Sequence, residues 1–437
     1  MTLAAESSDG AAPASSTAPA RGRLATAAAN LGLAAASVAV SLVVVELFVR
    51  LLYGAPPQWR TPQVKHQLTR YGYKPVPHQE AYSGGAQVET NSHGFRGPEW
   101  AVPKPPATFR VMVLGDSLSF GNMVRYEDTF AARLQQALRA RGPGAEVVLA
   151  ATGGWDTAQE LAFLEQEGLG YQPDVVVLGF FYNDYRLPAD SARPVALMPE
   201  GRVDERPPWL RWIPYRFVYA VKRSALVTFL RNRFANFLSG RTGQHGPDFD
   251  TALMDNQVAL EHDEHITAVH QMLARMNAIC AARGLRLLVA HVPPINLFWY
   301  PRGSRAYVAN LQRFCRERGI EFLDLSERFW KEHDTNALYL YPWDNHMSPR
   351  GHAAVAEELA RVVGGWFDAM RIRGAGDDPG ELGHAAPPRA VARAPRRPHG
   401  QRAAQPRPEA SLAKLVPCLC SSRCLPEIVA CGMYNGN

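Results

Sequence analysis

The apolar residues of this chain follow two patterns: one long uncharged run near the start, and a series of shorter runs from residue 107 onward. Residues 24–45 contain no charged side chain. A helix of this length, rising about 1.5 Å per residue, spans a hydrocarbon core of roughly 30 Å. The apolar core of a signal peptide is normally only about 7–15 residues long. We therefore expect a single-pass membrane anchor at residues 24–52, with a cleaved signal peptide or a buried soluble helix as alternatives.

Basic residues flank this run on both sides, Arg21 and Arg23 before it and Arg50, Arg60 and Lys65 after it. The positive-inside rule needs an excess of Lys and Arg on one side of a span. The charges therefore do not indicate which way the anchor is oriented.

Shorter apolar runs alternate with helical patterns between residues 107 and 370. The expected strand 174–180 carries no polar side chain after its first residue, Asp174, as expected of a parallel strand that is covered on both faces. This alternation predicts one three-layer α/β/α domain with a five-stranded parallel sheet. The expected strands are 109–114, 146–150, 174–180, 285–291 and 320–325; the expected helices are 130–140, one capped by Asp156, 261–283, 304–318 and 349–370.

The other segments surround or interrupt this domain of residues 107–370. Residues 1–23 and 371–437 have the Ala-, Ser- and Pro-rich or Arg- and Pro-rich composition of disordered tails. Residues 53–106 are expected to be an extended connector, and residues 187–261 an insertion. Six cysteines are too few for a disulfide scaffold. The four in the last twenty residues are interpreted as incidental tail sequence, with a zinc site as the alternative: Cys418, Cys420, Cys424 and Cys431.

The net charge of +6 comes mostly from the C-terminal tail, so the body is nearly neutral. One local basic feature stands out at residues 206–238, which carry seven Lys or Arg, no acidic residue and eight aromatic residues. Such a mixture is typical of a helix at a membrane interface or of a surface that binds nucleic acid. Because an anchor is predicted upstream, we favour the membrane, keep a lid as the alternative, and expect no nucleic-acid partner.

Candidate chemistry begins where the first strand ends, at Gly115-Asp116-Ser117. A serine nucleophile needs a base and a group that orients the base. Asp344 and His346 precede the last helix and, two residues apart in an extended loop, face the same way. The alternative for Ser117 is a helix cap. Two other histidines are weaker candidates. His291 ends the fourth strand, near the predicted cleft, and His352 is expected in the first turn of the last helix.

Two further positions suit the stabilisation of an oxyanion, which needs N–H donors. Gly154 follows the second strand and Asn183 follows the third. Ligands of parallel sheets bind at the carboxyl ends of the strands. The serine, glycine, asparagine and histidine are therefore expected to meet at one edge of the sheet.

In these features the sequence resembles the SGNH, or GDSL-type, hydrolases over residues 107–370. The matching motifs are Gly115-Asp116-Ser117, residues 154–159 (GWDTAQ), Asn183-Asp184 and Asp344-x-His346. The resemblance implies the flavodoxin-like fold, Ser117 as nucleophile and His346 as base, and an oxyanion hole of Ser117 N–H, Gly154 N–H and the Asn183 amide. It implies no metal or organic cofactor. Residues 91–97 also resemble the lead-in of membrane-anchored bacterial members, which usually place the catalytic domain outside the cytoplasmic membrane.

The sequence departs from the family pattern in two places. Many members carry Asp three residues before the His, where this chain has Trp343; Asp344 stands two before it, as in some esterases and polysaccharide O-acetyl-transferring relatives. Either Asp344 orients His346, or a backbone carbonyl does. Leu149 and Ala151 occupy positions where Asn and Gly are frequent.

Together these features predict a membrane-anchored serine esterase or lipase-like hydrolase that forms an acyl-enzyme on Ser117. An O-acyltransferase acting on a cell-envelope polysaccharide is the first alternative, since both reactions share the acyl-enzyme. A catalytically silent envelope binding protein is the second. The expected partners are a small-molecule or glycan ester and the membrane, through residues 24–52, with residues 206–238 as a second candidate contact.

Overall fold

The structure is a computed structural model that describes residues 20–185, 197–198, 201–203, 212–242, 263–299 and 301–376. Its centre is one parallel sheet with strand order β6-β5-β7-β8-β9. The strands are β5 (Phe109–Gly115), β6 (Ala145–Ala151), β7 (Val175–Phe180), β8 (Arg286–His291) and β9 (Glu321–Asp324). Every residue of β5 and β7 is buried, which explains their uninterrupted apolar sequences.

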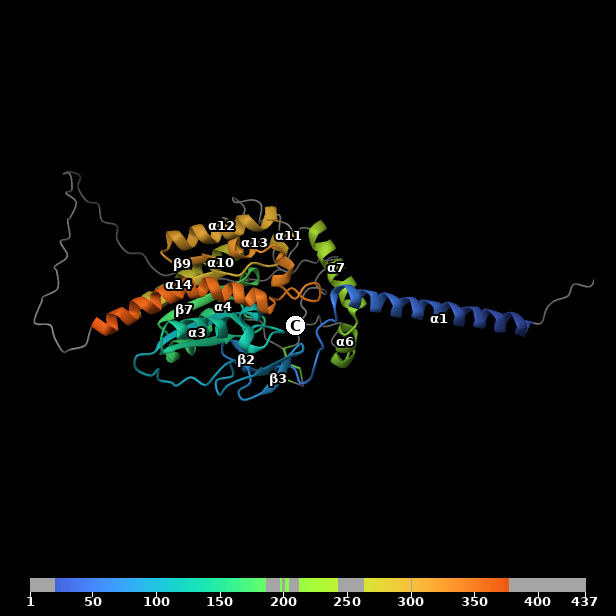
Figure 1. Cartoon of the computed structure of the whole chain (residues 1–437), viewed down its shortest axis with the longest axis horizontal. Coiled ribbons are helices and arrows are strands. Elements are labelled where there is room, and N and C mark those ends of the chain that lie inside the picture. Colours follow the sequence, from blue (N-terminus) through green and yellow to red (C-terminus); the bar gives the residue numbers. More distant parts are fainter. Residues whose placement is uncertain are drawn as a thin grey trace, which may run out of the picture.

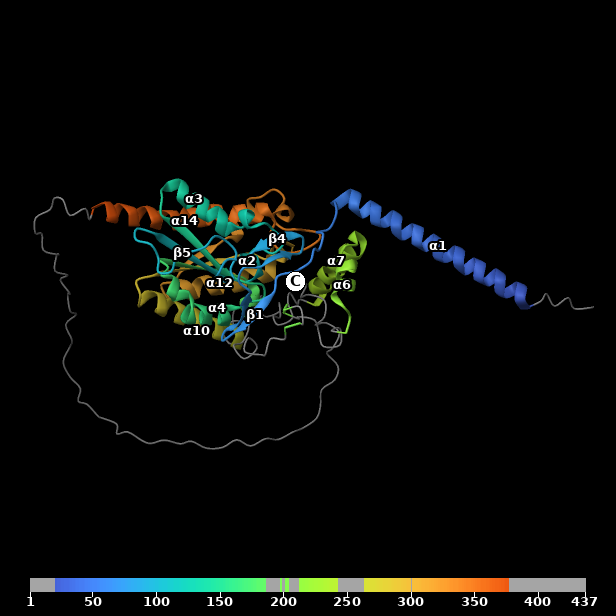
Figure 2. The same ribbon diagram turned by 90° about the horizontal axis from the view of Figure 1, so that it is seen from below.

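Helices cover both faces of the sheet (Figures 1 and 2). Val111 and Val113 belong to one hydrophobic core, with α3 (Phe130–Arg141) and α14 (Pro349–Gly376). Met112 and Leu114 belong to the other, with α4 (Thr157–Gln166), α10 (Glu264–Ala281) and α12 (Pro301–Glu317). Successive side chains of β5 thus enter opposite layers, as strand geometry requires. The predicted α/β/α fold is confirmed.

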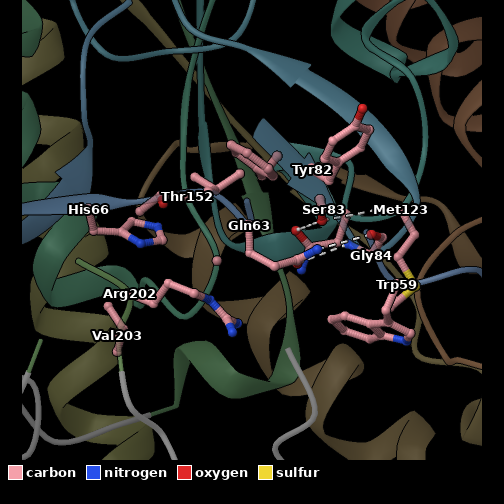
Figure 3. A pocket seen from close by; sticks show the side chains of 14 residues that line it. Trp59, Gln63, His66, Tyr82, Ser83, Gly84, Met123, Thr152, Arg202 and Val203 are labelled. Atoms are coloured by element: carbon pink, nitrogen blue, oxygen red, sulfur yellow. Dashed lines mark hydrogen bonds between the residues drawn. The ribbon is translucent and has the colours of Figure 1, made fainter. Parts of the chain in front are cut away.

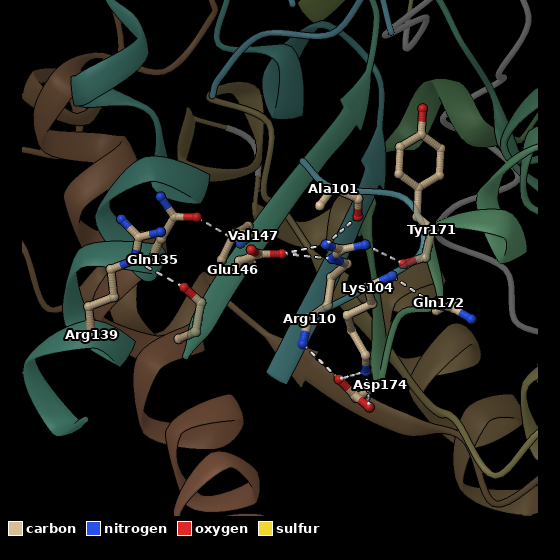
Figure 4. Close-up of polar contacts among 11 residues, drawn as sticks. Ala101, Lys104, Arg110, Gln135, Arg139, Glu146, Val147, Tyr171, Gln172 and Asp174 are labelled. Carbon is tan, nitrogen blue, oxygen red and sulfur yellow. Dashed lines mark hydrogen bonds and ion pairs between the residues drawn. The ribbon is translucent and has the colours of Figure 1, made fainter. Parts of the chain in front are cut away.

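The amino ends of the strands are held together by a buried ion pair (Figure 4). The Arg110 side chain is fully buried and lies 2.6 Å from the carboxylate of Glu146. It also donates to the carbonyl of Tyr171 at 2.6 Å, and the Arg110 N–H donates to Asp174 at 2.7 Å. This network satisfies the polar groups at the end of the sheet opposite to Ser117.

The segment expected to be an extended connector is folded against the sheet domain. It forms two hairpins, β1 (His66–Thr69) with β2 (Gly72–Pro75), and β3 (Glu80–Ser83) with β4 (Ala86–Glu89). Strands of four residues are too short to show a clear alternation in the sequence, which is why they escaped prediction. The buried Arg96 guanidinium donates to the carbonyls of Phe120, Gly121 and Val124 and so fixes the chain after the Ser117 helix.

The long helix α1 (Ala20–Tyr53) projects away from the body (Figures 1 and 2). Within Ala25–Tyr53 the most apolar stretch of 18 residues has a mean hydropathy of 2.3 and is almost entirely exposed. Their length and composition suit a membrane span, and equally a signal sequence. Two helices lie at the base of α1: α6 (Tyr215–Lys222) and α7 (Ala225–Thr242). Residues 1–19, most of the insertion outside 212–242, and residues 377–437 with the four C-terminal cysteines lie outside the described residues. The first residues of the expected C-terminal tail, 371–376, belong to α14.

Candidate active site

The turn after β5 places Ser117 at the carboxyl edge of the sheet. Gly115 and Gly179 leave space for Ser119 here, because a Cβ on either residue would overlap the Ser119 hydroxyl. Ser117 is the first residue of the short helix α2 (Ser117–Phe120), and the cap of that helix is Asp116, which accepts from Leu118 N–H at 2.8 Å. Ser117 therefore stands inside the helix rather than as its cap.

The loop before α14 brings His346 to this serine. His346 Nε2 lies 2.8 Å from Ser117 Oγ. On the other side of the ring, His346 Nδ1 lies 2.5 Å from Asp344 Oδ1, which also accepts from the His346 N–H at 2.9 Å. The sequence left open whether Asp344 or a backbone carbonyl orients His346. In the structure, the carboxylate of Asp344 lies next to Nδ1. The three side chains form the hydrogen-bonded series that nucleophilic catalysis by serine requires.

The charge state of Asp344 follows from these contacts. Burial by itself would raise the pKa of this carboxyl, but the adjacent His346 and its hydrogen bonds outweigh burial and hold the pKa below its usual value. Asp344 is therefore ionised at neutral pH. It is placed to stabilise a positive charge on the His346 imidazole.

The three predicted oxyanion donors lie after neighbouring strands. Neither the Ser117 N–H nor the Gly154 N–H has an acceptor within the described part of the chain. Gly154 has a φ of 80°, a conformation that favours glycine. The Asn183 amide donates to Asp116 Oδ2 at 3.0 Å. One N–H of that amide is thus used to hold its orientation, and the second is left for a ligand.

The turn that carries Gly154 is well formed although Leu149 and Ala151, shortly before it, depart from the family pattern. Leu149 and Ala151 are buried in β6. Ala151 pairs with Gly115, and the following Thr152 N–H donates to the Gly115 carbonyl at 3.3 Å. These contacts connect the turn that carries Gly154 to the end of the strand that carries Ser117.

Two buried acids lie beneath the turn that carries Asn183: Asp184, which belongs to the motif Asn183-Asp184, and Glu160, which no sequence motif included. Asp184 accepts from the Phe181 N–H at 2.6 Å, which closes the turn, and Glu160 is a fully buried residue of α4. Burial, followed by the charges of neighbouring carboxylates, raises the pKa of both groups well above the usual value. A protonated carboxyl is therefore favoured at this position.

The connector also reaches the site, which no sequence pattern indicated. Asn122 Nδ2 lies 3.4 Å from His346 Nε2, and its Oδ1 accepts from the Ser83 hydroxyl at 3.1 Å. Ser83 ends strand β3, outside the expected catalytic domain. The β3–β4 hairpin thus forms part of the surroundings of His346.

A pocket opens beside these residues (Figure 3). It encloses about 600 Å³, including space open to solvent, and its lining mixes polar and apolar groups. Phe120, Asn122, Thr152 and Gly153 are sequence neighbours of Ser117 and Gly154, so the pocket adjoins the proposed reaction centre. Most of the wall comes from the connector and from the insertion: Trp59, Gln63, Val64, His66, Tyr82, Ser83, Gly84, Arg202 and Val203, with Met123 beside them.

The two other histidines considered from the sequence lie elsewhere. His291 is buried, with Nε2 2.7 Å from the Tyr307 hydroxyl and Nδ1 3.1 Å from Asp324. His352 is buried in the first turn of α14, where Nδ1 accepts from the Phe130 N–H at 3.2 Å. Burial lowers the pKa of His352 to about 3. Both contribute to packing, and neither has a contact with Ser117. In the described ranges no group of three or more His, Cys, Asp or Glu side chains is arranged to hold a metal ion.

Comparison with known proteins identifies the family to which this chain belongs. No curated protein matches the chain. Similar solved structures include an acetyl xylan esterase (15% identity, covering 58% of this chain and 100% of that one, TM-score 0.35). They also include a lipolytic G-D-S-L protein from Veillonella parvula (11%, 58% and 98%, TM-score 0.33) and a lipase/acylhydrolase from Enterococcus faecalis (13%, 58% and 95%, TM-score 0.33). The model of the GDSL-like lipase/acylhydrolase family matches residues 113–354, more than half of the chain. The chain therefore belongs to the GDSL-like lipase/acylhydrolase family and is a hydrolase that acts on ester bonds.

Proposed function

We propose that this protein is a membrane-anchored serine esterase of lipase-like type. The observation that carries the proposal is the series Ser117 Oγ, His346 Nε2 and Nδ1, and Asp344 Oδ1, joined at 2.8 and 2.5 Å. Ser117 attacks the ester carbonyl while His346 takes its proton. The imidazolium then gives this proton to the leaving alcohol, and the acyl group stays on Ser117. Water, activated by the same histidine, releases the acid and restores the serine.

Three donors stabilise the negative charge that develops on the carbonyl oxygen. They are the N–H groups of Ser117 and Gly154 and the side-chain amide of Asn183. In support, both backbone N–H groups are without an acceptor in the part of the chain that is described, and Asp116 orients the amide. In other enzymes one such donor lowers the activation barrier by about 3–4 kcal/mol.

The domain arrangement belongs to the same proposal. Residues 24–52 anchor the protein in the cytoplasmic membrane, and residues 107–370, with the insertion 187–261, form the hydrolase domain on the extracytoplasmic side. Residues 53–106 connect them and contribute pocket walls. Residues 1–23 and 371–437 are tails, and residues 206–238 contact the membrane surface. The exposed apolar surface of α1 and its place outside the body support this arrangement.

A second candidate is O-acyl transfer to a sugar of the cell envelope, and the polar part of the pocket favours it. Gln63, Ser83, Asn122 and Thr152 line the space beside Ser117, where a sugar hydroxyl would replace water as acceptor of the acyl group. The acyl-enzyme is common to both reactions. Only the second step differs.

The test of the proposed function is Ser117→Ala in the full chain, in membrane fractions. We expect loss of hydrolysis of short-chain p-nitrophenyl esters and loss of labelling by a fluorophosphonate probe. Ser92→Ala, at an exposed connector serine, should keep both. Undiminished hydrolysis by Ser117→Ala would overturn the proposal. Comparing acyl release to water with acyl transfer to added sugars separates the esterase from the acyltransferase.

A further inference from the structure

Helices α6 and α7 lie between the base of α1 and the catalytic body (Figures 1 and 2). The contact with α1 is specific. The Glu46 carboxylate of α1 accepts from the Ser224 hydroxyl at 2.9 Å and from the N–H groups of Ala225 and Leu226 at 2.9 and 2.8 Å. These N–H groups are in the first turn of α7, where a helix otherwise lacks acceptors and favours negative charge. The end of α1 therefore caps α7.

The inner face of α7 holds the loop that carries Asp344 and His346. Ala225 packs with Val49 of α1 and with Trp343, the residue before Asp344. About two turns further along, the Asn232 side-chain amide donates to two successive carbonyls, those of Pro342 at 2.7 Å and Trp343 at 2.8 Å. A single side chain thus fixes the backbone directly before Asp344.

The outer face of α7 is apolar and exposed. At about 100° per residue, Val227, Leu230 and Phe234 lie on the side of the helix opposite to Ala225 and Asn232. Leu230 and Phe234 are 55% and 52% exposed.

Helix α6 repeats this arrangement. Tyr219 is buried, whereas Phe217 and Val221 lie on the opposite side of the helix and are each 53% exposed. Arg216 of α6 and Arg233 of α7 are also exposed. Exposed apolar stripes with neighbouring arginines, at the point where an apolar helix leaves the body, fit a lipid surface with its headgroups.

We propose that α7 braces the active site against the membrane: its outer face rests in the lipid surface, and its inner face, through Asn232, holds the loop of Asp344 and His346 in the reactive geometry. Asn232 is a positioning residue, since it touches neither substrate nor the reacting atoms. The proposal rests on the proposed function of Ser117 and His346 and on the proposed membrane contact of residues 206–238, and it adds a structural dependence of the site on the anchor.

The inner contact is tested with Asn232→Ala and Asn232→Asp in the full chain in nanodiscs of phosphatidylethanolamine and phosphatidylglycerol. Both variants lose the two donors, and Asp keeps the size of the side chain. We expect kcat to fall about tenfold, the effect of two neutral hydrogen bonds, with KM unchanged. The rate at which the fluorophosphonate probe labels Ser117 should fall by the same factor.

Asn277→Ala is the matched control, because Asn277 of α10 also donates to a backbone carbonyl, that of Arg318 at 3.2 Å, without contacting the catalytic loop. It should keep the wild-type kcat. Wild-type kcat in both Asn232 variants would overturn the brace. Failure of the proposed function would give a different result, namely full activity of the Ser117→Ala variant.

A double-mutant cycle tests whether Glu46 and Asn232 act through the same helix. Glu46→Gln weakens the cap on α7 and should lower kcat in the wild-type background. It should have little further effect in Asn232→Ala, since the link to the loop is already cut. Purely additive effects would show that α7 does not transmit the restraint from α1.

The outer contact is tested with the photoreactive residue p-benzoylphenylalanine at position 230 or 234. Illumination of the full chain in the same nanodiscs should give lipid adducts at both positions. The control position is Ile372, which is 74% exposed and lies near the far end of α14, away from α1 (Figure 1). Absence of lipid adducts at 230 and 234, or equal yields at 372, would overturn the membrane contact.

Discussion

Replacing Asp344 by Asn removes the charge next to His346 while keeping the shape of the side chain. In the proposed reaction His346 becomes positively charged when it takes the proton of Ser117. Asp344 lies 2.5 Å from His346 Nδ1 and carries a negative charge at neutral pH, because its pKa is held below the usual value. The substitution therefore acts on the transition state and leaves the binding of the neutral ester largely unchanged.

The magnitude follows from the geometry and the burial. The side chains of His346 and Asp344 are 16% and 12% exposed, so the pair is partly screened by solvent. Two unit charges about 4 Å apart attract each other by about 4 kcal/mol at an effective dielectric constant of 20. Since about 1.4 kcal/mol corresponds to a factor of ten in rate, we expect kcat of Asp344→Asn to fall about a thousandfold.

The assay is steady-state hydrolysis of a short-chain p-nitrophenyl ester, with KM and kcat measured separately. Asp324→Asn is the matched control, because Asp324 also faces the Nδ1 of a histidine, His291, at 3.1 Å and has no contact with Ser117. We expect the control to change stability and to retain kcat. If Asp344→Asn kept more than about a tenth of the wild-type kcat, the charge would contribute under about 1.4 kcal/mol. The site would then work as a dyad of Ser117 and His346.

Three further predictions concern the donors and the buried titratable groups. Asn183→Ala should lower kcat about a hundredfold with little change in KM, as expected for the loss of one oxyanion donor; an unchanged kcat would remove Asn183 from the oxyanion hole. His352 has a folded-state pKa of about 3 and an ordinary value near 6.5, so its contribution to stability is lost as the pH falls below about 6.5. His352→Asn keeps an acceptor for Phe130, and between pH 7 and pH 5 it should lose about 2 kcal/mol less unfolding free energy than the wild type in urea titrations; equal losses would contradict this. Glu160 and Asp184 have raised pKa values, so stability falls as the pH rises above the ordinary carboxyl range; Glu160→Gln should flatten this decrease when thermal melting is followed upward from about pH 4.5, and an unchanged slope would refute it.

The sheet domain could be predicted from the sequence because its central strands β5 and β7 are completely buried. An unbroken apolar run follows Asp174, and the structure has β7 at Val175–Phe180. The position of the site could also be predicted, because each of its residues comes directly after a strand or before a helix. The loops at the carboxyl ends of the strands bring them together: Ser117, Gly154, Asn183 and His346. Parallel strands leave little freedom in where these loops meet.

Contacts between distant segments could not be predicted in this way. Asn232 lies 110 residues before Pro342, and Ser83 lies 39 residues before Asn122. Nothing in the local pattern around these residues indicates the partner, because a single polar side chain has no periodicity. The four short strands of the connector escaped for a related reason: their stability comes from packing on the sheet domain rather than from their own sequence.

Trp343 shows how the anchor and the departure from the family pattern are connected. Many relatives carry Asp at this position, three residues before the His, whereas here the position packs an indole ring against Val49 of α1 and Ala225 of α7. An aspartate there would bury a charge in an apolar contact at a cost of several kcal/mol. In the proposed site, this position cannot both pack against α1 and orient His346. Asp344 takes the second task one residue later, in a turn closed by its own bond to the His346 N–H at 2.9 Å. The altered spacing of the acid is therefore the counterpart of a catalytic loop that is packed against the base of α1.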